Sequence, residues 1–502
     1  MQPSGSPLFR FDNTYARDLE GFYVPWKPAE VRAPRLLFLN GKLAEELGLD
    51  PAALLGDEGA AIFAGNQLPE GAQPLAQAYA GHQFGGFSPQ LGDGRALLLG
   101  ELIDREGRRR DVAFKGSGRT PFSRGGDGRA AVGPMLREVL VGEAMHALGI
   151  PTTRALAVAA TGEPVVREKV LPGAVLARVA SSHLRVGTFE FFTARGEYDK
   201  LRQLADYAIR RHDPDLADAP GRYLALLGRV AQRQAALIAQ WMNVGFIHGV
   251  MNTDNMTISG ETIDYGPCAF MEAYDPKAVF SSIDANGRYA YGNQPAIAQW
   301  NLARLAEALL PLLVKGEDES AADQAVADAT EVLRAFPAQY EAQLLRGQRM
   351  KLGLGDSEDA ADTALVKDWL DLLHAQQVDF TLGWRRLADA AAGDEAPLQA
   401  LFAQPQPLQA WLARWRSRCE SDAAVSPAER AARMRSASPW IIARNHRVEE
   451  ALEAATENGD LAPFERLLSA LRKPFDELPE NAAYAQPATA AMTASYRTFC
   501  GT

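Results

Sequence analysis

The chain has 502 residues, of which 47% are hydrophobic and 23% are charged, the balance of a folded globular protein with a large core. Its formal net charge of −11 argues against nucleic acid or an anionic membrane surface as the main partner. Three cysteines, an N-terminus unlike a secretion signal and no apolar run of about 20 residues predict a cytoplasmic protein without a disulfide scaffold or a membrane span.

The first half of the chain is expected to contain most of the strands. Residues 1–75 mix proline, aromatic and helical segments, and we expect an extension packed on the remainder of the chain. Beyond them a helix is predicted at 133–148, because Gly149 and Pro151 form a typical helix exit. Short apolar runs bounded by turn residues predict strands at 96–103, 111–114, 154–159 and 174–179.

The second half is predicted to be mostly helical. Apolar residues recur at three- and four-residue spacing in 223–243 and 295–313, and alanine-rich helices follow to about residue 472. The acidic stretch 317–331 is expected to be an exposed helix. The exception is 256–263, where Ser259 and Gly260 are expected to turn a short hairpin.

This order of elements is typical of a bilobal, protein-kinase-like fold of the α+β class. The predicted units are an N-terminal extension, an N-lobe, a C-lobe core with the catalytic and metal loops, and an enlarged helical C-terminal region, at 1–75, 76–187, 188–320 and 321–502.

The strongest functional motif begins at His248. Together with Asp264-Tyr265-Gly266, residues 248–255 have the form of the catalytic and metal loops of kinase-like phosphotransferases. In those enzymes an aspartate two residues after the histidine accepts a proton from the acceptor hydroxyl. Here that position is Val250, which cannot accept a proton, and a carboxylate returns at Asp254.

Two interpretations of this motif are open. Asn255 and Asp264 supply the hard oxygen ligands that Mg²⁺ or Mn²⁺ prefers beside nucleotide phosphates. If Asp254 is the displaced base, the site is active with rearranged chemistry. If Asp254 only caps its own loop, the fold is catalytically inert.

Two glycine-containing segments have the composition of phosphate-binding loops. Gly92 and Gly94 precede Arg95, and glycines let backbone amides approach phosphate oxygens while a guanidinium binds phosphate through two hydrogen bonds. An ordinary hairpin turn also explains this pattern. The second segment contains Asp127 and Gly128 and is either a flexible connector or a second nucleotide-covering loop.

Lys115 ends a predicted strand at the place where kinases carry their phosphate-binding lysine. Its carboxylate partner should lie on the following helix, where Glu138 and Glu143 both qualify, and periodicity does not decide between them. Arg178 and Arg185 fall where kinases hold adenine. Two guanidinium groups suit a triphosphate and not a purine, which suggests a nucleotide bound in reverse, although surface salt bridges also explain arginines.

Taken together, the chain resembles the selenoprotein O family over almost its whole length. The resemblance rests on YAGHQFG at 79–85, GDGR at 92–95, FKGSG at 114–118, SSHLRVG at 181–187, HGVMNTDNM at 248–256 and DYGP at 264–267, with shorter matches as far as 444–445.

The resemblance implies a pseudokinase fold that transfers AMP from ATP to Ser, Thr or Tyr hydroxyls of proteins, with Mg²⁺ or Mn²⁺. It implies that Glu138 pairs with Lys115, that Asn255 and Asp264 hold the metal, and that Asp254 accepts the proton. The residues that would bind the flipped nucleotide are Gly92, Gly94, Arg95, Lys115, Asp127, Gly128, Arg178 and Arg185.

Some alternatives stay open at this point. A conventional kinase would transfer the γ-phosphate, UTP could replace ATP, and an inert scaffold would transfer nothing. Redox control in the family needs a cysteine in the gating segment, where Cys268 lies, and a partner near the C-terminus, where this chain has Cys500. Buried, unreactive thiols are the alternative to a disulfide.

Overall fold

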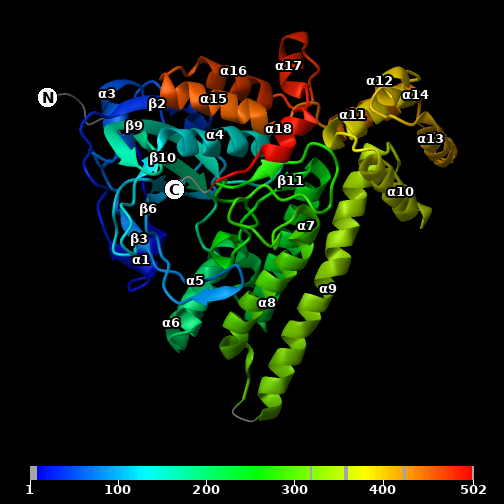
Figure 1. Cartoon of the computed structure of the whole chain (residues 1–502). Helices are drawn as coiled ribbons and strands as arrows, with labels where there is room; N and C mark the ends of the chain where they lie inside the picture. Colours follow the sequence, from blue (N-terminus) through cyan, green and yellow to red (C-terminus); the bar gives the residue numbers. More distant parts are fainter. Residues whose placement is uncertain (1–7, 317–318, 356–359, 422–424, 500–502) are drawn as a thin grey trace.

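The computed structural model describes residues 8–316, 319–355, 360–421 and 425–499 (Figure 1). Its centre is an eight-stranded antiparallel sheet in the order β1-β3-β6-β7-β10-β9-β2, with β8 beside β10. The strands are β1 (Tyr23–Pro25), β2 (Arg35–Leu39), β3 (Leu75–Gln77), β6 (Ala96–Ile103), β7 (Arg109–Lys115), β8 (Ala130–Ala131), β9 (Arg154–Val166) and β10 (Val170–Ala180). Two short pairs lie outside it: β4 (Gly81–Gln83) with β5 (Gly86–Ser88), and β11 (Phe246–Ile247) with β12 (Ala269–Phe270).

Helices cover both faces of the sheet. Short helices of the N-terminal region lie on one face and bury an apolar layer there, and α4 lies on the other. The helices up to this point are α1 (Thr14–Asp18), α2 (Gly41–Glu46), α3 (Gly56–Ala64) and α4 (Val132–Ala147).

The second half is helical apart from loops and the β11–β12 pair. Its helices are α5 (Val186–Thr193), α6 (Tyr198–His212), α7 (Arg222–Val244), α8 (Gln294–Leu313), α9 (Glu319–Lys351), α10 (Ala361–Ala375), α11 (Phe380–Ala391), α12 (Ala396–Gln399), α13 (Pro405–Glu420), α14 (Pro427–Ala437), α15 (Asn445–Glu457), α16 (Ala462–Leu471), α17 (Ala482–Ala485) and α18 (Ala490–Ser495).

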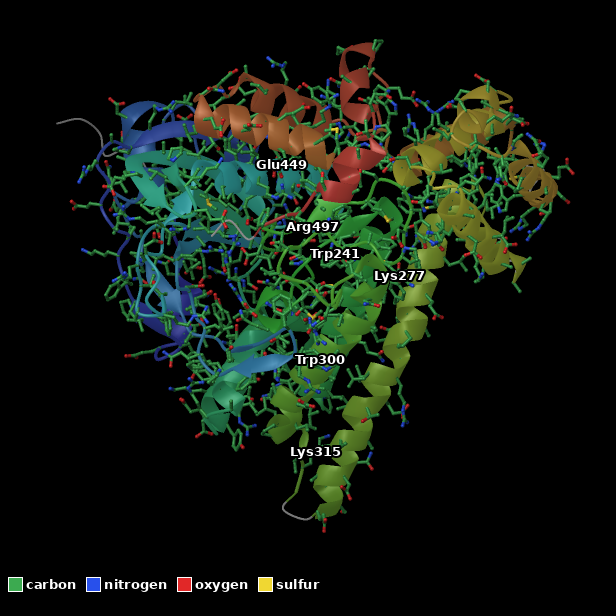
Figure 2. The ribbon with its side chains drawn as sticks, in the orientation of Figure 1. Trp241, Lys277, Trp300, Lys315, Glu449 and Arg497 are labelled. Carbon is green, nitrogen blue, oxygen red and sulfur yellow. The ribbon has the colours of Figure 1, made fainter. Side chains whose placement is uncertain are left out.

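The chain returns to its first half at the C-terminal end. Helix α9 runs along α7 and α8, and α10 to α14 form a separate group beyond its end (Figure 1). Helices α15 and α16 then pack on α4, on the side away from the sheet. From α18 the chain runs back across the middle of the molecule, where Arg497 lies below Glu449 of α15 (Figure 2). The helix α4 is therefore enclosed on two sides, and 13 of its 16 residues are buried.

The α+β class and most elements predicted in the central region are confirmed. The hairpin of β6 and β7, the helix α4 and the helices α7 and α8 lie where the sequence predicts them, and β9 and β10 are longer than expected. The first 75 residues do more than pack on the rest of the chain, because β1 and β2 form the two edges of the sheet. Residues 317–318 of the acidic stretch lie outside the described residues, and the remainder is the largely exposed start of α9.

The hairpin predicted at 256–263 is wrong. A turn does occur, with Gly260 at a φ of 76°. The two sides form no backbone ladder with each other. The Thr257 side chain bonds to the Glu261 backbone across the turn, but the backbone bridges run from Thr257 to Arg185 and from Thr262 to Thr152. The segment therefore ties the catalytic-type loops to the first half of the chain. In the described part of the chain, no helix is both long and apolar enough to cross a membrane.

A buried lysine lies where α7, α9 and α11 meet. The Lys351 ammonium donates to the carbonyl of Asn243 and lies 5.5 Å from the Phe380 ring and 5.3 Å from the Trp384 ring. It pairs with no carboxylate in the described part of the chain, and burial is the one influence on its pKa. Burial lowers the pKa of Lys351 to about 7.

This lysine makes stability depend on pH. The unfolded chain keeps the proton to about pH 10 while the folded chain releases it near pH 7, so stability should rise between these values, by about 2 kcal/mol from pH 7 to pH 9. We expect Lys351→Met to remove this rise in urea unfolding, and the exposed control Lys277→Met to keep it (Figure 2). An unchanged pH dependence in Lys351→Met would contradict the assignment.

Candidate active site

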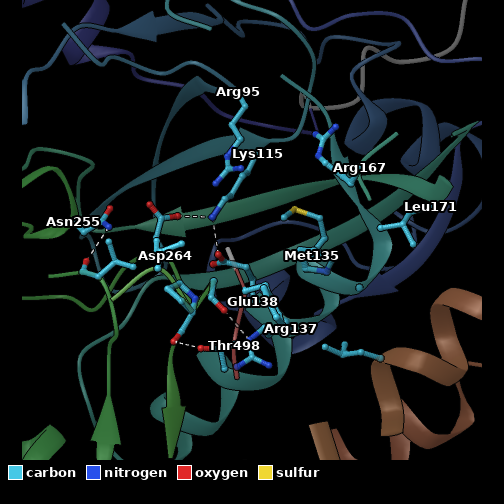
Figure 3. A pocket seen from close by; sticks show the side chains of 18 of the residues that line it. Arg95, Lys115, Met135, Arg137, Glu138, Arg167, Leu171, Asn255, Asp264 and Thr498 are labelled. Atoms are coloured by element: carbon cyan, nitrogen blue, oxygen red, sulfur yellow. Dashed lines mark hydrogen bonds and ion pairs between the residues drawn. The ribbon is translucent and has the colours of Figure 1, made fainter. Parts of the chain in front are cut away.

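A cleft of about 1590 Å³ brings together the regions that the sequence singled out. One wall comes from the glycine-containing loops and the sheet, a second from the segment 250–267, and a third from α15 and the residues after α18. Figure 3 shows side chains from these walls facing one another. All the predicted site residues line this single cleft: Gly92, Gly94, Arg95, Lys115, Asp127, Gly128, Glu138, Arg178, Arg185, Asp254, Asn255 and Asp264.

Four charged side chains meet at the inner part of the cleft. The Lys115 Nζ lies 2.6 Å from Glu138 Oε1 and 2.5 Å from Asp264 Oδ1, and Arg178 Nη1 lies 2.8 Å from the same Asp264 oxygen (Figure 3). Antiparallel pairing places Arg178 opposite Ala113. Because side chains alternate along a strand, Arg178 and Lys115 share one face of the sheet.

The structure decides between the two glutamates left open by the sequence. Glu138 contacts Lys115, whereas Glu143 binds Arg154 Nε at 2.6 Å and Arg472 Nη2 at 3.0 Å. Both glutamates are buried. The pairing predicted by the resemblance is therefore the one that forms.

The two aspartates of the motif have opposite acid–base character. Burial alone would raise the pKa of Asp264, but the charges of Lys115 and Arg178 outweigh it and hold this pKa well below the usual range. For Asp254 burial dominates over the nearby Arg185 charge and raises the pKa to about 6. At neutral pH Asp264 is a permanent anion, and Asp254 is a carboxylate that is basic enough to accept a proton.

Asp254 is held from one side by the β4–β5 hairpin. Gln83 Nε2 donates to Asp254 Oδ2 at 3.2 Å, and Asp254 Oδ1 is buried without a hydrogen-bond partner among the described residues. A Cβ at Gly81 would lie 2.8 Å from that oxygen, so the close approach requires glycine.

Arg185 is a buried cation without a carboxylate partner among the described residues. Its guanidinium lies 4.2 Å from the centre of the Tyr79 ring, and it donates to the carbonyls of His183 at 3.1 Å and Asp254 at 3.3 Å. A buried guanidinium favours an anion. With Arg178, it makes the inner end of the cleft a site for negatively charged groups.

Asn255 and Asp264 are the residues predicted to hold a metal ion. Asn255 Nδ2 donates to the carbonyl of Val250 at 3.0 Å, which leaves the Asn255 amide oxygen without a partner among the described residues. Asp264 Oδ2 is likewise free of described partners. These oxygens fit Mg²⁺ or Mn²⁺. In the described ranges no group of three His, Cys, Asp or Glu side chains could hold an ion alone, so further ligands such as phosphate oxygens would be required.

Close packing against Phe122 explains why the first loop has glycine at positions 92 and 94. A Cβ at Gly92, whose φ is 69°, would lie 2.4 Å from the Phe122 ring, and one at Gly94 would lie 2.9 Å from the Phe122 carbonyl. The adjacent Arg95 side chain lines the cleft and has no partner among the described residues. Figure 3 shows it above Lys115.

The second loop is fixed by an arginine that sequence reasoning missed. Arg167 contacts Asp127 at 2.8 and 3.0 Å. Gly128 has a φ of 68°, and a Cβ there would lie 2.1 Å from the Gly118 carbonyl. The loop is therefore attached to Arg167 through Asp127, and it lines the cleft.

Sequence reasoning also missed the wall formed by the end of the chain. Thr498 Oγ1 donates to the Pro267 carbonyl at 2.7 Å, and Tyr496 donates to Glu449 at 2.7 Å. Glu449 in turn contacts Arg137 at 3.2 Å. No local pattern predicts these contacts, because Thr498 and Pro267 are 231 positions apart, Arg137 and Glu449 are 312 apart, and Tyr496 and Glu449 are 47 apart.

Cys268 lies behind this wall. Its thiol is buried and donates to the Tyr265 carbonyl at 3.3 Å, and burial raises its pKa to about 11. The expected partner, Cys500, lies outside the described residues. A disulfide between the two stays a prediction.

Comparisons with known proteins identify the family of this chain. Residues 8–472 match the family model described as "Protein adenylyltransferase SelO". The chain is 64% identical over 495 residues to the protein nucleotidyltransferase YdiU of Cereibacter sphaeroides strain ATCC 17023, which covers 98% of this chain and 100% of the relative. It is 62% identical over 481 residues to that of Chromobacterium violaceum, covering 96% and 99%, and 58% identical over 500 residues to that of Rhizobium etli, covering 99% and 98%. The chain belongs to the SelO family of protein adenylyltransferases and is a nucleotidyltransferase.

Proposed function

We propose that the chain transfers AMP from ATP to Ser, Thr or Tyr hydroxyls of proteins, in a bilobal protein-kinase-like fold and with Mg²⁺ or Mn²⁺. ATP is bound in reverse, with its β- and γ-phosphates at the inner end of the cleft. The sheet with α4 corresponds to the N-lobe, and α5 to α8 with the loops from His248 to Asp264 correspond to the C-lobe.

One observation supports the reversed orientation of the nucleotide. The inner end of the cleft holds Arg178 and Arg185, which are only 4% and 3% exposed. A purine there would leave Arg185 without an anion among the described residues and Arg178 with Asp264 alone, whereas phosphate oxygens would supply negative charge to both. The outer part offers apolar side chains instead, with Met135 and Leu171 lining the cleft opposite Leu452 of α15. Figure 3 shows Met135 and Leu171 on the side of the cleft away from Asp264.

The chemical step follows from this orientation. With the triphosphate tail held by Lys115, Arg178 and Arg185, the α-phosphorus is the one left near Asp254. The acceptor oxygen forms a bond to the α-phosphorus, the bond from that phosphorus to the oxygen bridging to the β-phosphate breaks, and pyrophosphate leaves. The acceptor proton passes to the Asp254 carboxylate. A metal ion held by Asn255 and Asp264 would neutralise charge on the phosphates.

The fate of the label in ATP tests the reaction. We expect the α-phosphorus of ATP to appear on protein and the γ-phosphorus to leave as pyrophosphate, because reversal exposes the α-phosphorus. Intact mass after incubation with ATP and Mn²⁺ should show a gain of one AMP on self-modification. Transfer of γ-label would establish a conventional kinase, and no transfer of either label would establish an inert scaffold.

The proton role of Asp254 gives a second prediction. Asp254→Asn keeps the shape of the side chain but removes its basicity, so single-turnover AMP transfer should fall about 100-fold or more while ATP binding changes little. The exposed Asp199→Asn serves as the matched control. Wild-type rates in Asp254→Asn would remove the assignment.

Substitution of Arg178 tests the orientation of the bound nucleotide by binding measurements alone, without catalysis. Arg178→Met removes a charge-assisted contact to the phosphate tail, so ATP affinity should fall about 10- to 100-fold. Adenosine affinity should stay near that of the wild type, because the purine lies at the other end. Calorimetry measures both, with the exposed Arg202→Met as control. Equal losses for ATP and adenosine would instead indicate a purine against Arg178.

A further inference from the structure

The β4–β5 hairpin is a rigid projection beside the catalytic aspartate. Its turn contains Phe84 and Gly85, with φ values of 53° and 88°. A left-handed conformation costs free energy in a bulky residue such as phenylalanine. The backbone of Phe84 is held there by two hydrogen bonds, from its N–H to Asn252 Oδ1 and to the Tyr289 hydroxyl, each of 3.1 Å.

The same hairpin exposes an apolar side chain at the cleft. Phe84 is 41% exposed, although its ring centre lies only 5.2 Å from that of Tyr289. Ile283, which is 49% exposed, borders the same cleft. Gln83, the residue before Phe84, is the donor to Asp254 Oδ2. One hairpin therefore joins an exposed ring to the carboxylate that is proposed to accept the proton.

Phe87 supplies an internal comparison. It lies on the second strand of the hairpin, is 42% exposed, and packs near His82 with ring centres 4.9 Å apart. Unlike Phe84, it does not line the cleft. The hairpin thus exposes one aromatic ring at the cleft and another away from it. Substituting each ring in turn separates an effect at the cleft from an effect of exposure alone.

We propose that this hairpin selects the protein acceptor: Phe84, together with Ile283 of the same cleft, contacts an apolar side chain next to the acceptor hydroxyl, and Gln83 is a positioning residue for Asp254. The occupant is a segment of the substrate polypeptide in which the hydroxyl residue is flanked by an apolar residue. The proposal rests on the proposed function and adds the substrate class to it. Its physical basis is that Phe84 is exposed at the cleft next to Gln83, which donates a hydrogen bond to the Asp254 carboxylate. The hydrogen bonds of the Phe84 backbone hold the ring in place.

The test uses the full-length enzyme, α-labelled ATP and two synthetic peptides. Each peptide carries one central tyrosine, flanked by leucines in one peptide and by glutamines in the other. The wild type should prefer the leucine-flanked peptide, and Phe84→Asn should raise KM for that peptide about tenfold, as expected for the loss of one buried aromatic contact. KM for ATP should not change.

The choice of variants separates recognition from folding. Asparagine tolerates positive φ better than phenylalanine does, so Phe84→Asn should unfold at the wild-type temperature or above it. Phe84→Tyr should retain the preference, and Phe87→Ser should behave like the wild type. In Gln83→Leu we expect kcat to fall about tenfold for both peptides, with KM for ATP unchanged, as for the loss of an orienting hydrogen bond.

Several results would overturn the inference. They are an equal use of the two peptides by the wild type, a preference that survives in Phe84→Asn, an equal effect of Phe87→Ser, or an unchanged kcat in Gln83→Leu. Self-modification of the wild type with α-labelled ATP reports the proposed function separately. If it occurs while the peptide series shows one of these results, the acceptor inference alone fails.

Discussion

The ion cluster of Lys115, Glu138, Arg178 and Asp264 is the interaction on which the site depends. It joins two strands, the helix α4 and the loop between β11 and β12 at one largely buried point. A buried charge costs free energy unless it is paired, so the position of every member restricts the others. A shift of α4 along the sheet would separate Glu138 from Lys115 and leave Asp264 as the carboxylate that contacts Lys115. The cluster thus fixes how the two halves of the enzyme face each other.

The cluster also separates the chemistry of two nearby carboxylates. Asp264 is surrounded by cations and stays ionised, while Asp254 lies in a drier position with Arg185 as its main charged neighbour. An enzyme that needs one carboxylate for charge and another for proton transfer requires such a difference. In this chain the difference comes from the environment alone, since both groups are aspartates.

Local sequence patterns predicted much of this site because its parts are short and chemically distinctive. Lys115 follows an apolar strand, and Asp254, Asn255 and Asp264 fall within one loop region. The choice between Glu138 and Glu143 could not be made from periodicity, because α4 is buried on almost every side and so has no single apolar face. The resemblance made that choice correctly. The three-residue strands β4 and β5 gave no alternating pattern long enough to recognise.

The errors have a common cause in long-range pairing. The turn residues at 256–263 predict a segment that pairs with itself, but Thr257 and Thr262 find partners from the first half of the chain. The third wall of the cleft likewise comes from α15 and the residues after α18, which are far along the chain from the loops that they face. Turn residues indicate where a chain reverses, and they do not indicate which segment supplies the hydrogen bonds on either side.

The late position of Thr498 has a consequence for biosynthesis. Its contacts with Phe280, Ser282 and Pro267 complete one wall of the cleft, so that wall is incomplete until at least 498 residues have been translated. A shorter nascent chain already carries the nucleotide-binding loops and α15 but lacks the part of the wall that Thr498 closes. A chain truncated before Thr498 would therefore have a cleft that is more open on that side.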